Sequence, residues 1–335
     1  MEKRIGIFIG FSILAIFIAP LIFTSGAICE RFEFLQTGPI GDTIGGCTAP
    51  IVGIVSVVLL YLTLKSQLDF NKTQTNLQRD EQFKSTLFYL LGQQRDILLS
   101  LHEDFEFLKR GNFDKTKYSV SGQAYFTHAL FQLQKLFHVL EKSTAYSNSI
   151  TEEEKNGILE DLSYRIYDGI NLPSDMKEEN KNNIESTHNL LWLNFLVNKF
   201  SISEEEFNDY KKNEDACDKI KFVYRKFFAV YFRNGYYFRH LYRLLKFIDN
   251  TALEEIKRNP AEKASIQRKY GEYAQFVQAQ MSFDEMLLVF YNCSLFVKTK
   301  HLIVKYNILE NLYLENLILP NHIPLGEELH LSHHP

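Results

Sequence analysis

Two long stretches near the start of the chain contain no Asp, Glu, Lys, Arg or His: residues 5–29 and residues 43–64. A helix needs about 20 residues to cross the hydrocarbon layer of a membrane, so each stretch is long enough for one crossing. We predict a hairpin of two transmembrane helices in residues 1–66, with spans at about 5–25 and 48–65 and a connector at 26–47.

The first stretch also has the charge pattern of a signal peptide, because Lys3 and Arg4 precede its apolar run. It is longer than the apolar segment of a signal peptide, and residues 16–23 offer no small-x-small cleavage site. A second apolar stretch follows closely. We therefore expect the first stretch to remain in the protein as a membrane helix.

Basic residues flank the two stretches on their outer sides. Lys3 and Arg4 precede the first and Lys65 and Lys72 follow the second, whereas the connector has only Arg31 against three acidic residues. Loops rich in Lys and Arg remain in the cytosol. We therefore predict a protein of the bacterial inner membrane, with both termini in the cytoplasm and the lipid bilayer as a partner.

The end of the connector is rich in glycine. Gly41, Asp42, Gly45 and Gly46 precede Pro50, a residue that suits the first turn of a helix. We expect these residues to form an irregular turn at the membrane surface. Asp42 is either a turn or cap residue, or a carboxylate for ion passage or ligand sensing.

The four cysteines fit this topology. Cys29 and Cys47 fall in the connector, where an oxidising periplasm would permit a disulfide, whereas Cys217 and Cys293 fall in the reducing cytosol. The sequence leaves open whether the first two pair.

From residue 67 to residue 320 the sequence predicts an all-α cytosolic domain. Apolar residues recur at three- and four-residue spacing from Phe83 onward, as on one face of a helix. Strand-like segments are scarce, and we expect loops at 111–121 and 172–175. Three helix starts have the capping-box pattern of Ser or Thr followed three residues later by Glu: Thr151 with Glu154, Ser203 with Glu206, and Ser282 with Glu285.

Two other polar segments suit structural roles. The acidic run from Glu103 to Glu106 is typical of a solvated face. Residues 321–335 are rich in histidine, but prolines and the terminal position favour a frayed tail. We predict no metal site there, because a frayed tail gives metal ligands no supporting layer. The histidines are His322, His330, His333 and His334.

Residues 219–248 contain no Asp or Glu, and basic residues alternate there with aromatic ones. In one interpretation the rings fill the core of a helix pair, and the basic groups pair with acidic residues at 152–154 or 204–206. In the other, cations and rings together bind phosphate or nucleic acid. The candidates for the second interpretation are Arg225, Lys226, Arg239, Tyr242 and Arg243.

Within this stretch six residues separate Arg233 from His240, and Asn234 follows the Arg. The pattern resembles the R-x4-6-H motif of HEPN ribonucleases, whose Arg and His cleave RNA without a metal, usually across a dimer. A His can move a proton near neutral pH, and an Arg can stabilise charge at phosphorus. The resemblance implies catalytic roles for Arg233 and His240 if the protein is an enzyme.

Other enzyme patterns are absent from the sequence. It has no P-loop, no H-E-x-x-H zinc motif, no G-x-S-x-G, no CxxC pair and no dinucleotide fingerprint. The net charge of −4 gives no general attraction to nucleic acid. We therefore predict no cofactor and leave enzymatic activity open.

Two groups of motifs resemble the AbiC-type phage abortive infection family of bacteria. The first comprises residues 37–42, Gly45, Gly46, Pro50 and residues 61–67. The second comprises residues 237–249, 273–282, 285–292 and 305–312. The resemblance implies a defence protein that blocks phage propagation, often by disabling the infected cell, and it implies no catalytic mechanism.

Three functional hypotheses follow. In the first, an antiphage effector or sensor detects infection with its helical domain and perturbs the membrane through its hairpin. This version requires a homo-oligomer, because two helices cannot enclose a pore. The second is a membrane-tethered RNase or nucleotide-handling enzyme, with RNA as a partner. The third is a non-enzymatic scaffold that recruits a phage component or a defence partner.

Overall fold

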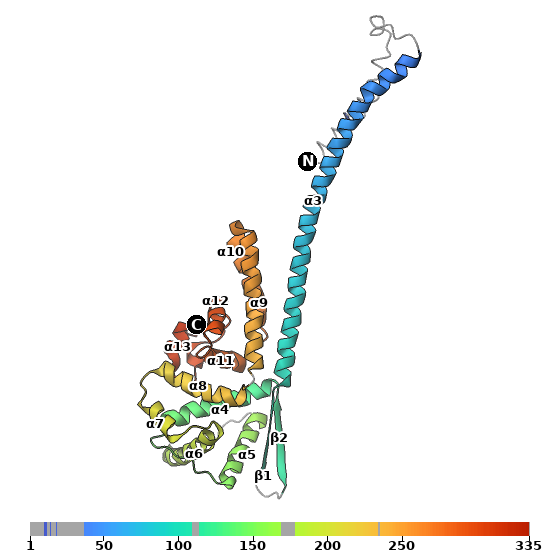
Figure 1. Ribbon diagram of the computed structural model, residues 1–335. Coiled ribbons are helices and arrows are strands. Elements are labelled where there is room, and N and C mark those ends of the chain that lie inside the picture. Colours follow the sequence, from blue (N-terminus) through green and yellow to red (C-terminus); the bar gives the residue numbers. More distant parts are fainter. Residues whose placement is uncertain are drawn as a thin grey trace. The chain divides into compact units, whose positions relative to one another are not determined.

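Helices dominate the computed structural model, which describes residues 10, 11, 14, 18, 37–108, 114–168, 178–233 and 235–334 (Figure 1). The prediction of a mostly α protein is confirmed. The helices are α3 (Thr37–Ser100), α4 (Gln123–Lys142), α5 (Glu152–Asp168), α6 (Glu178–Lys199), α7 (Glu204–Lys212), α8 (Ala216–Tyr231), α9 (Tyr236–Arg258), α10 (Lys263–Gln278), α11 (Phe283–Asn292), α12 (Val297–Lys305) and α13 (Ile323–Glu328), and the strands are β1 (His102–Leu108) and β2 (Lys115–Ser121).

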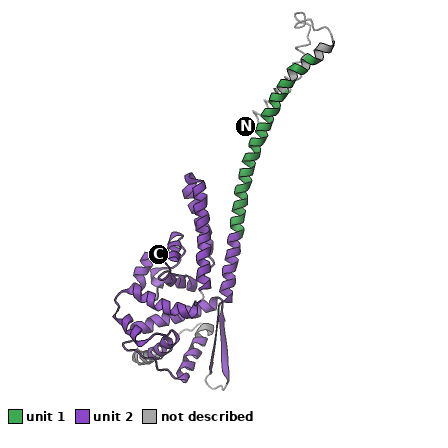
Figure 2. Ribbon diagram, viewed as in Figure 1, with its two compact units in different colours: residues 1–85 green, residues 86–335 purple. Residues whose placement is uncertain are grey.

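The chain divides into two compact units, residues 1–85 and residues 86–335 (Figure 2). The described part of the first unit is almost entirely helix α3. The second unit contains the end of α3, both strands and the other helices.

Helix α3 runs without a break for 64 residues. The predicted irregular turn is therefore wrong, because Gly41, Asp42, Gly45 and Gly46 are all helical. Pro50 lies inside the helix instead of at its start. Glycine and proline weaken a helix, which is why this segment resembles a turn in sequence. An uncharged segment has few other partners for its backbone groups, however, and a continuous helix satisfies most of them.

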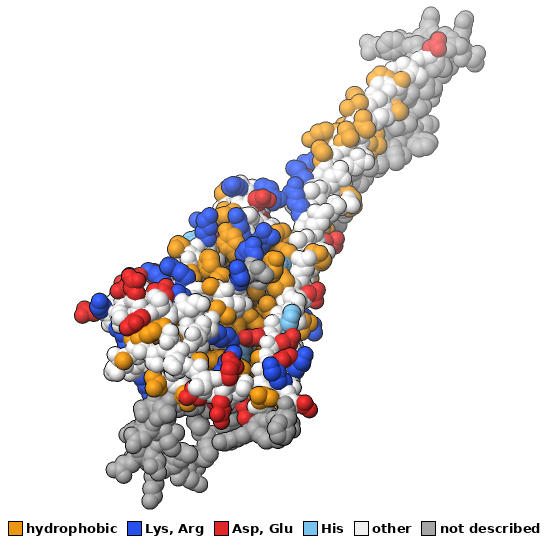
Figure 3. Space-filling view, turned by 60° about the horizontal axis from the view of Figure 1, so that its bottom comes forward, with side chains coloured by type: hydrophobic (Ala, Val, Ile, Leu, Met, Phe, Trp, Pro, Cys, Tyr) orange, Lys and Arg blue, Asp and Glu red, His pale blue; other side chains and the backbone are white. Residues whose placement is uncertain are grey.

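One described segment, Val52–Ser100 of α3, is long and apolar enough to cross a membrane. Its apolar side chains are exposed, since Ile54, Val57 and Leu60 each keep 60% or more of their surface. Figure 3 shows hydrophobic side chains along this helix. The first predicted span lies outside the described residues except at positions 10, 11, 14 and 18, and so does Cys29. The two-helix hairpin and the disulfide therefore remain predictions.

Helix α4 lies at the centre of the second unit, in contact with α6, α8, α11 and β2. Its Leu133 and Phe137 are fully buried. Rings from α8 and α9 complete this core, and the ring centroid of Tyr237 lies 4.7 Å from that of Phe126. The rings of the basic aromatic stretch therefore pack in a core, as one interpretation predicted: Tyr224, Phe227, Tyr231, Phe232, Tyr237 and Phe238 are buried.

The second unit also contains an antiparallel hairpin of β1 and β2 within its mostly helical structure, so the predicted loop at 111–121 is wrong where strand β2 replaces it, at residues 115–121. Phe105 pairs with Tyr118 across the hairpin. Exposure alternates along both strands, as expected when one face of a sheet is covered. The predicted solvated face holds for Asp104 and Glu106, which are exposed, whereas Glu103 and Phe105 point toward His128 of α4. The predicted loop at 172–175 lies outside the described residues.

All three predicted capping boxes are confirmed, at the starts of α5, α7 and α11. In each box the hydroxyl oxygen accepts from the Glu backbone N–H, and the Glu side chain accepts from the cap residue's N–H. The pairs are Thr151 with Glu154, Ser203 with Glu206, and Ser282 with Glu285.

The expectation of a frayed C-terminal tail is wrong for the described residues. Pro320 begins a 3-10 turn, Pro320–His322, that leads into α13. His322 is 2% exposed, and its Nδ1 is hydrogen-bonded to the hydroxyl of Tyr291 at 2.8 Å. Leu325 and Leu329, which follow His322 closely in the sequence, are also buried. These apolar side chains anchor the segment, because burying them outweighs the disorder expected at a chain end.

Candidate functional site

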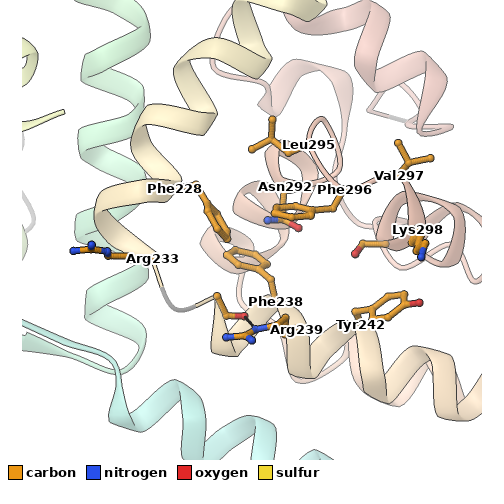
Figure 4. A pocket seen from close by; sticks show the side chains of 12 residues that line it. Phe228, Arg233, Phe238, Arg239, Tyr242, Asn292, Leu295, Phe296, Val297 and Lys298 are labelled. Atoms are coloured by element: carbon orange, nitrogen blue, oxygen red, sulfur yellow. Dashed lines mark hydrogen bonds between the residues drawn. The ribbon is translucent and has the colours of Figure 1, made fainter. Parts of the chain in front are cut away.

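A pocket of about 570 Å³ lies in the second unit among α8, α9, α11 and α12 (Figure 4). Its volume is within the range of small-molecule sites. The lining residues are Phe228, Arg233, Gly235, Phe238, Arg239, Tyr242, Asn292, Leu295, Phe296, Val297, Lys298 and Thr299.

The turn between α8 and α9 forms one side of the pocket. Gly235 has φ 55°, in the left-handed region, and a side chain there would be strained. Its carbonyl accepts from Nε of Arg239 at 3.4 Å, and the guanidinium of Arg239 lies 5.2 Å from the Tyr236 ring centroid. The turn therefore holds a cation at the pocket, one helical turn into α9.

The N-termini of two helices contribute to the lining of the pocket. Gly235 is the N-cap of α9, and the first three residues of α12, Val297, Lys298 and Thr299, line the opposite part. Neither helix has a side-chain cap or an acidic residue in its first turn. The N–H groups at a helix start have no partner within the helix and carry about half a positive charge. Both helices therefore favour an anion here.

The charged lining residues reinforce this preference. Arg233, Arg239 and Lys298 are basic, and none of the described lining residues is acidic. In Figure 4 the guanidinium of Arg233 points away from the other labelled side chains, whereas Arg239 and Lys298 lie on either side of Tyr242. The pocket therefore has a positive field, with two of its cations directed along its edge.

Aromatic rings form the apolar wall. The ring centroid of Phe228 lies 5.3 Å from that of Phe296 and 6.0 Å from that of Phe238. Tyr242 adds a fourth ring to the lining. A flat apolar group can stack against such a wall.

One buried polar group in the lining lacks a partner. Asn292 is fully buried, and its amide nitrogen donates to the hydroxyl of Tyr224 at 3.3 Å. Its Oδ1 has no hydrogen-bond partner among the described residues. A buried acceptor left unpaired costs about 1–3 kcal/mol, so the pocket retains a hydrogen-bonding group at the expense of stability.

The structure brings together only part of the predicted phosphate-binding set. Arg239 and Tyr242 line the pocket, whereas Arg225 and Arg243 are exposed and lie outside its lining. Lys226 donates to Glu206 Oε2 at 2.7 Å and to the Ser201 carbonyl at 2.9 Å. This lysine follows the structural interpretation, in which basic groups pair with the acidic residues at 204–206.

Arg233 and His240 do not line a common pocket. The ring of His240 faces the end of α3, where Nδ1 lies 2.7 Å from Gln94 Oε1 and Nε2 lies 3.4 Å from Gln93 Oε1. Burial, and then the charge of Arg243, lower the pKa of His240 below its usual value. The imidazole is therefore mostly neutral near pH 7, and its single N–H can donate to only one of the two glutamine oxygens, of which Gln94 Oε1 is the nearer.

A second polar cluster was missed by the sequence reasoning. Nζ of Lys199 on α6 lies 2.9 Å from Oε1 of Glu103 and 2.9 Å from the Tyr231 hydroxyl. Nε2 of His128 lies 3.0 Å from Oε2 of Glu103. No local pattern marks these residues, because they come from four separate elements. Among the described residues no three His, Cys, Asp or Glu side chains are placed to hold a metal ion.

The sequence reasoning also missed Asn292 and Lys298 as pocket residues. The sequence signal for Asn292 is that it ends one of the family motifs, at 285–292, and Lys298 lies in none of these motifs. The motifs also contact one another, since the Tyr237 hydroxyl donates to Glu285 Oε1 at 2.6 Å. The hydroxyl of Tyr306 likewise donates to Asp249 Oδ1 at 2.8 Å.

These features define a mostly helical protein that combines a long apolar helix with a cationic, ring-lined pocket. Residues 224–317 match the model of a family described as "Putative phage abortive infection protein". The resemblance to the AbiC-type abortive infection family is thereby confirmed. Comparison with curated proteins and with solved structures gave no match.

Proposed function

We propose that the protein is a phage-defence sensor and effector at the bacterial inner membrane, and that its helical unit responds to infection by binding a small anionic ligand in the pocket. One observation carries this proposal. All lining residues, from Phe228 to Thr299, fall within residues 224–317, the segment that matches the abortive-infection family. The segment that matches the family model is therefore the segment that builds the pocket.

The membrane part of the proposal is supported by the exposed apolar surface of α3. Side chains such as Ile54 and Val57 have no protein partner in the described chain and favour a lipid environment. The basic residues flanking the apolar stretches favour cytoplasmic termini. A homo-oligomer is needed for an effect on the membrane, since one or two helices cannot enclose a pore.

The RNase alternative receives less support. Its two candidate residues have different surroundings, since His240 is bonded to Gln94 and Arg233, in the turn before α9, lines the pocket. A composite site across a dimer would require the His240 ring to leave its glutamine partners. The ligand-sensing proposal requires no such change.

A phage challenge tests the proposal. Cells that produce the wild-type protein should lower plaque formation, and the double variant Arg239→Ala/Lys298→Ala should abolish this protection at equal protein level. Arg243→Ala is the matched control, because Arg243 is an exposed arginine on the same helix outside the pocket. Full protection by the double variant would contradict a role for the pocket.

A further inference from the structure

We infer that the ligand of this pocket is a free nucleotide, with its phosphate at the two helix N-termini, its base against the rings, and a base N–H bonded to Asn292. The inference deepens the proposed function and rests on it for the biological role. Three independent features of the pocket each require one part of such a ligand.

The phosphate is indicated by the positive groups in the lining. The starts of α9 and α12 present free N–H groups without any side-chain cap, an arrangement that binds phosphate in many proteins. Arg239 and Lys298 add two cations, and a guanidinium fits two phosphate oxygens at once. No described lining residue brings a negative charge that would repel the ligand.

The base is indicated by the apolar wall. Phe228 and Phe296, with ring centroids 5.3 Å apart, adjoin Phe238 in the same lining. Every nucleobase has a flat face that stacks on aromatic side chains. An inorganic anion would leave this wall without contact, so rings and cations together favour a ligand with both a flat apolar group and a phosphate.

The third feature is the unpaired Oδ1 of Asn292. An ionised phosphate can only accept hydrogen bonds and cannot satisfy it, so the donor is a base N–H or a ribose hydroxyl. All four nucleobases carry N–H donors on the edge that pairs in a duplex, and proteins commonly bind single bases through this edge. Asn292 lies beside Phe296 in Figure 4, so a base stacked on the wall would bring this edge to the amide oxygen.

The pocket suits a free nucleotide better than a nucleic-acid strand. Its volume of about 570 Å³ is sufficient for a nucleotide, and Lys226, which could extend a basic track along α8, is paired with Glu206. Strand binding uses a charged groove with several stacking platforms in succession. The described residues offer one such platform at this pocket.

Isothermal titration of the full chain in lipid nanodiscs tests this inference. The probes are AMP, GMP, CMP and UMP, with adenosine and inorganic phosphate as the two halves of a nucleotide. We expect at least one nucleotide to bind about tenfold or more tightly than either half. Arg239→Ala and Lys298→Ala should each weaken that binding by about 10- to 100-fold, and Arg243→Ala should leave it unchanged.

Asn292→Leu separates base recognition from phosphate binding. Leucine has a similar volume and removes the unpaired oxygen, so the variant should keep or raise the melting temperature. We expect it to weaken nucleotide binding by about tenfold while phosphate binds as before. If Asn292→Leu fails to fold, the arginine and lysine variants, which change exposed residues, still decide the question.

Several results would overturn the inference. One is that inorganic phosphate binds as tightly as every nucleotide. Another is that Arg239→Ala and Arg243→Ala lose nucleotide affinity equally. A third is that a single-stranded RNA oligomer binds more tightly than its mononucleotides. If the wild-type protein binds no nucleotide in vitro but the pocket variant loses phage protection, a nucleotide is not the ligand and the proposed function still stands. If the wild-type protein binds a nucleotide but the pocket variant still protects cells fully, the ligand stands and the proposed function is contradicted.

Discussion

Nζ of Lys199 on α6 lies 2.9 Å from Oε1 of Glu103 on β1, a residue 96 positions earlier in the chain. The two side chains are only 18% and 26% exposed. His128 of α4 approaches the second oxygen of the carboxylate at 3.0 Å. This ion pair therefore joins the β hairpin to two helices of the core.

Removing the carboxylate should destabilise the second unit. In Glu103→Gln the Lys199 ammonium loses its charged partner and keeps the Tyr231 hydroxyl. We expect the free energy of unfolding to fall by about 2 kcal/mol, between the values for buried and for exposed pairs. Urea unfolding followed by circular dichroism measures this change. Lys117→Gln is the control, because its pair with Glu106 is 80% and 44% exposed. An equal loss of unfolding free energy in Glu103→Gln and Lys117→Gln would contradict a stabilising role for the pair of Glu103 and Lys199.

The same carboxylate should make stability depend on pH. Burial alone would raise the pKa of Glu103, but bonds and charges from His128 and Lys199 outweigh it and lower the pKa from 4.5 to about 2. A carboxyl group with a lowered pKa contributes its full stabilisation of the fold above pH 4.5, and this stabilisation is lost as the pH falls toward 2. The gap in melting temperature between wild type and Glu103→Gln should therefore shrink over this interval. A constant gap would show that the carboxylate does not titrate as described.

His322 should give a separate pH dependence. Its burial lowers its pKa from 6.5 to about 4. The unfolded chain binds a proton below pH 6.5 and the folded chain does not until about pH 4, so stability should fall by up to about 3 kcal/mol over this range. His322→Gln should flatten this slope in unfolding measurements at several pH values. The exposed His301→Gln should leave it unchanged, and the same slope in both variants would exclude His322 as the source.

The apolar part of α3 should be needed for membrane attachment. Val57→Arg/Leu60→Arg places two charges where the helix would cross the bilayer, at a cost of about 2.5–3.5 kcal/mol each at the centre of a span. We expect alkaline washing to release more of this variant than of the wild type from isolated membranes. Leu77→Arg, further along the same helix and also exposed, should remain attached. Release of the wild-type protein itself would argue against a membrane helix.

Local chemistry explains which parts of the fold were predictable. The box of Ser203 and Glu206 depends on residues three positions apart, so the sequence alone shows it. The acidic run predicts a solvated face, which holds for the exposed Asp104 and Glu106; it does not show that Glu103 turns inward, where a lysine 96 residues away stabilises its partly buried carboxylate. His322 was likewise assigned to a frayed tail, since nothing near it in sequence indicates its contact with Tyr291.

The candidate site divides in the same way. Arg239 and Tyr242 were found because they belong to one basic aromatic stretch. Asn292 and Lys298 could not be found, since the packing of α11 and α12 against α9 brings them to the pocket. The alternatives for Lys226 were both visible in the sequence, and only its contact with Glu206 distinguishes them.

The most direct test of the account is the membrane potential of phage-infected cells, measured with a voltage-sensitive dye beside total RNA integrity. We predict depolarisation with intact RNA in cells that produce the wild-type protein, and a maintained potential with Arg239→Ala/Lys298→Ala. A maintained potential with fragmented RNA in wild-type cells would contradict a membrane effector and would favour a ribonuclease.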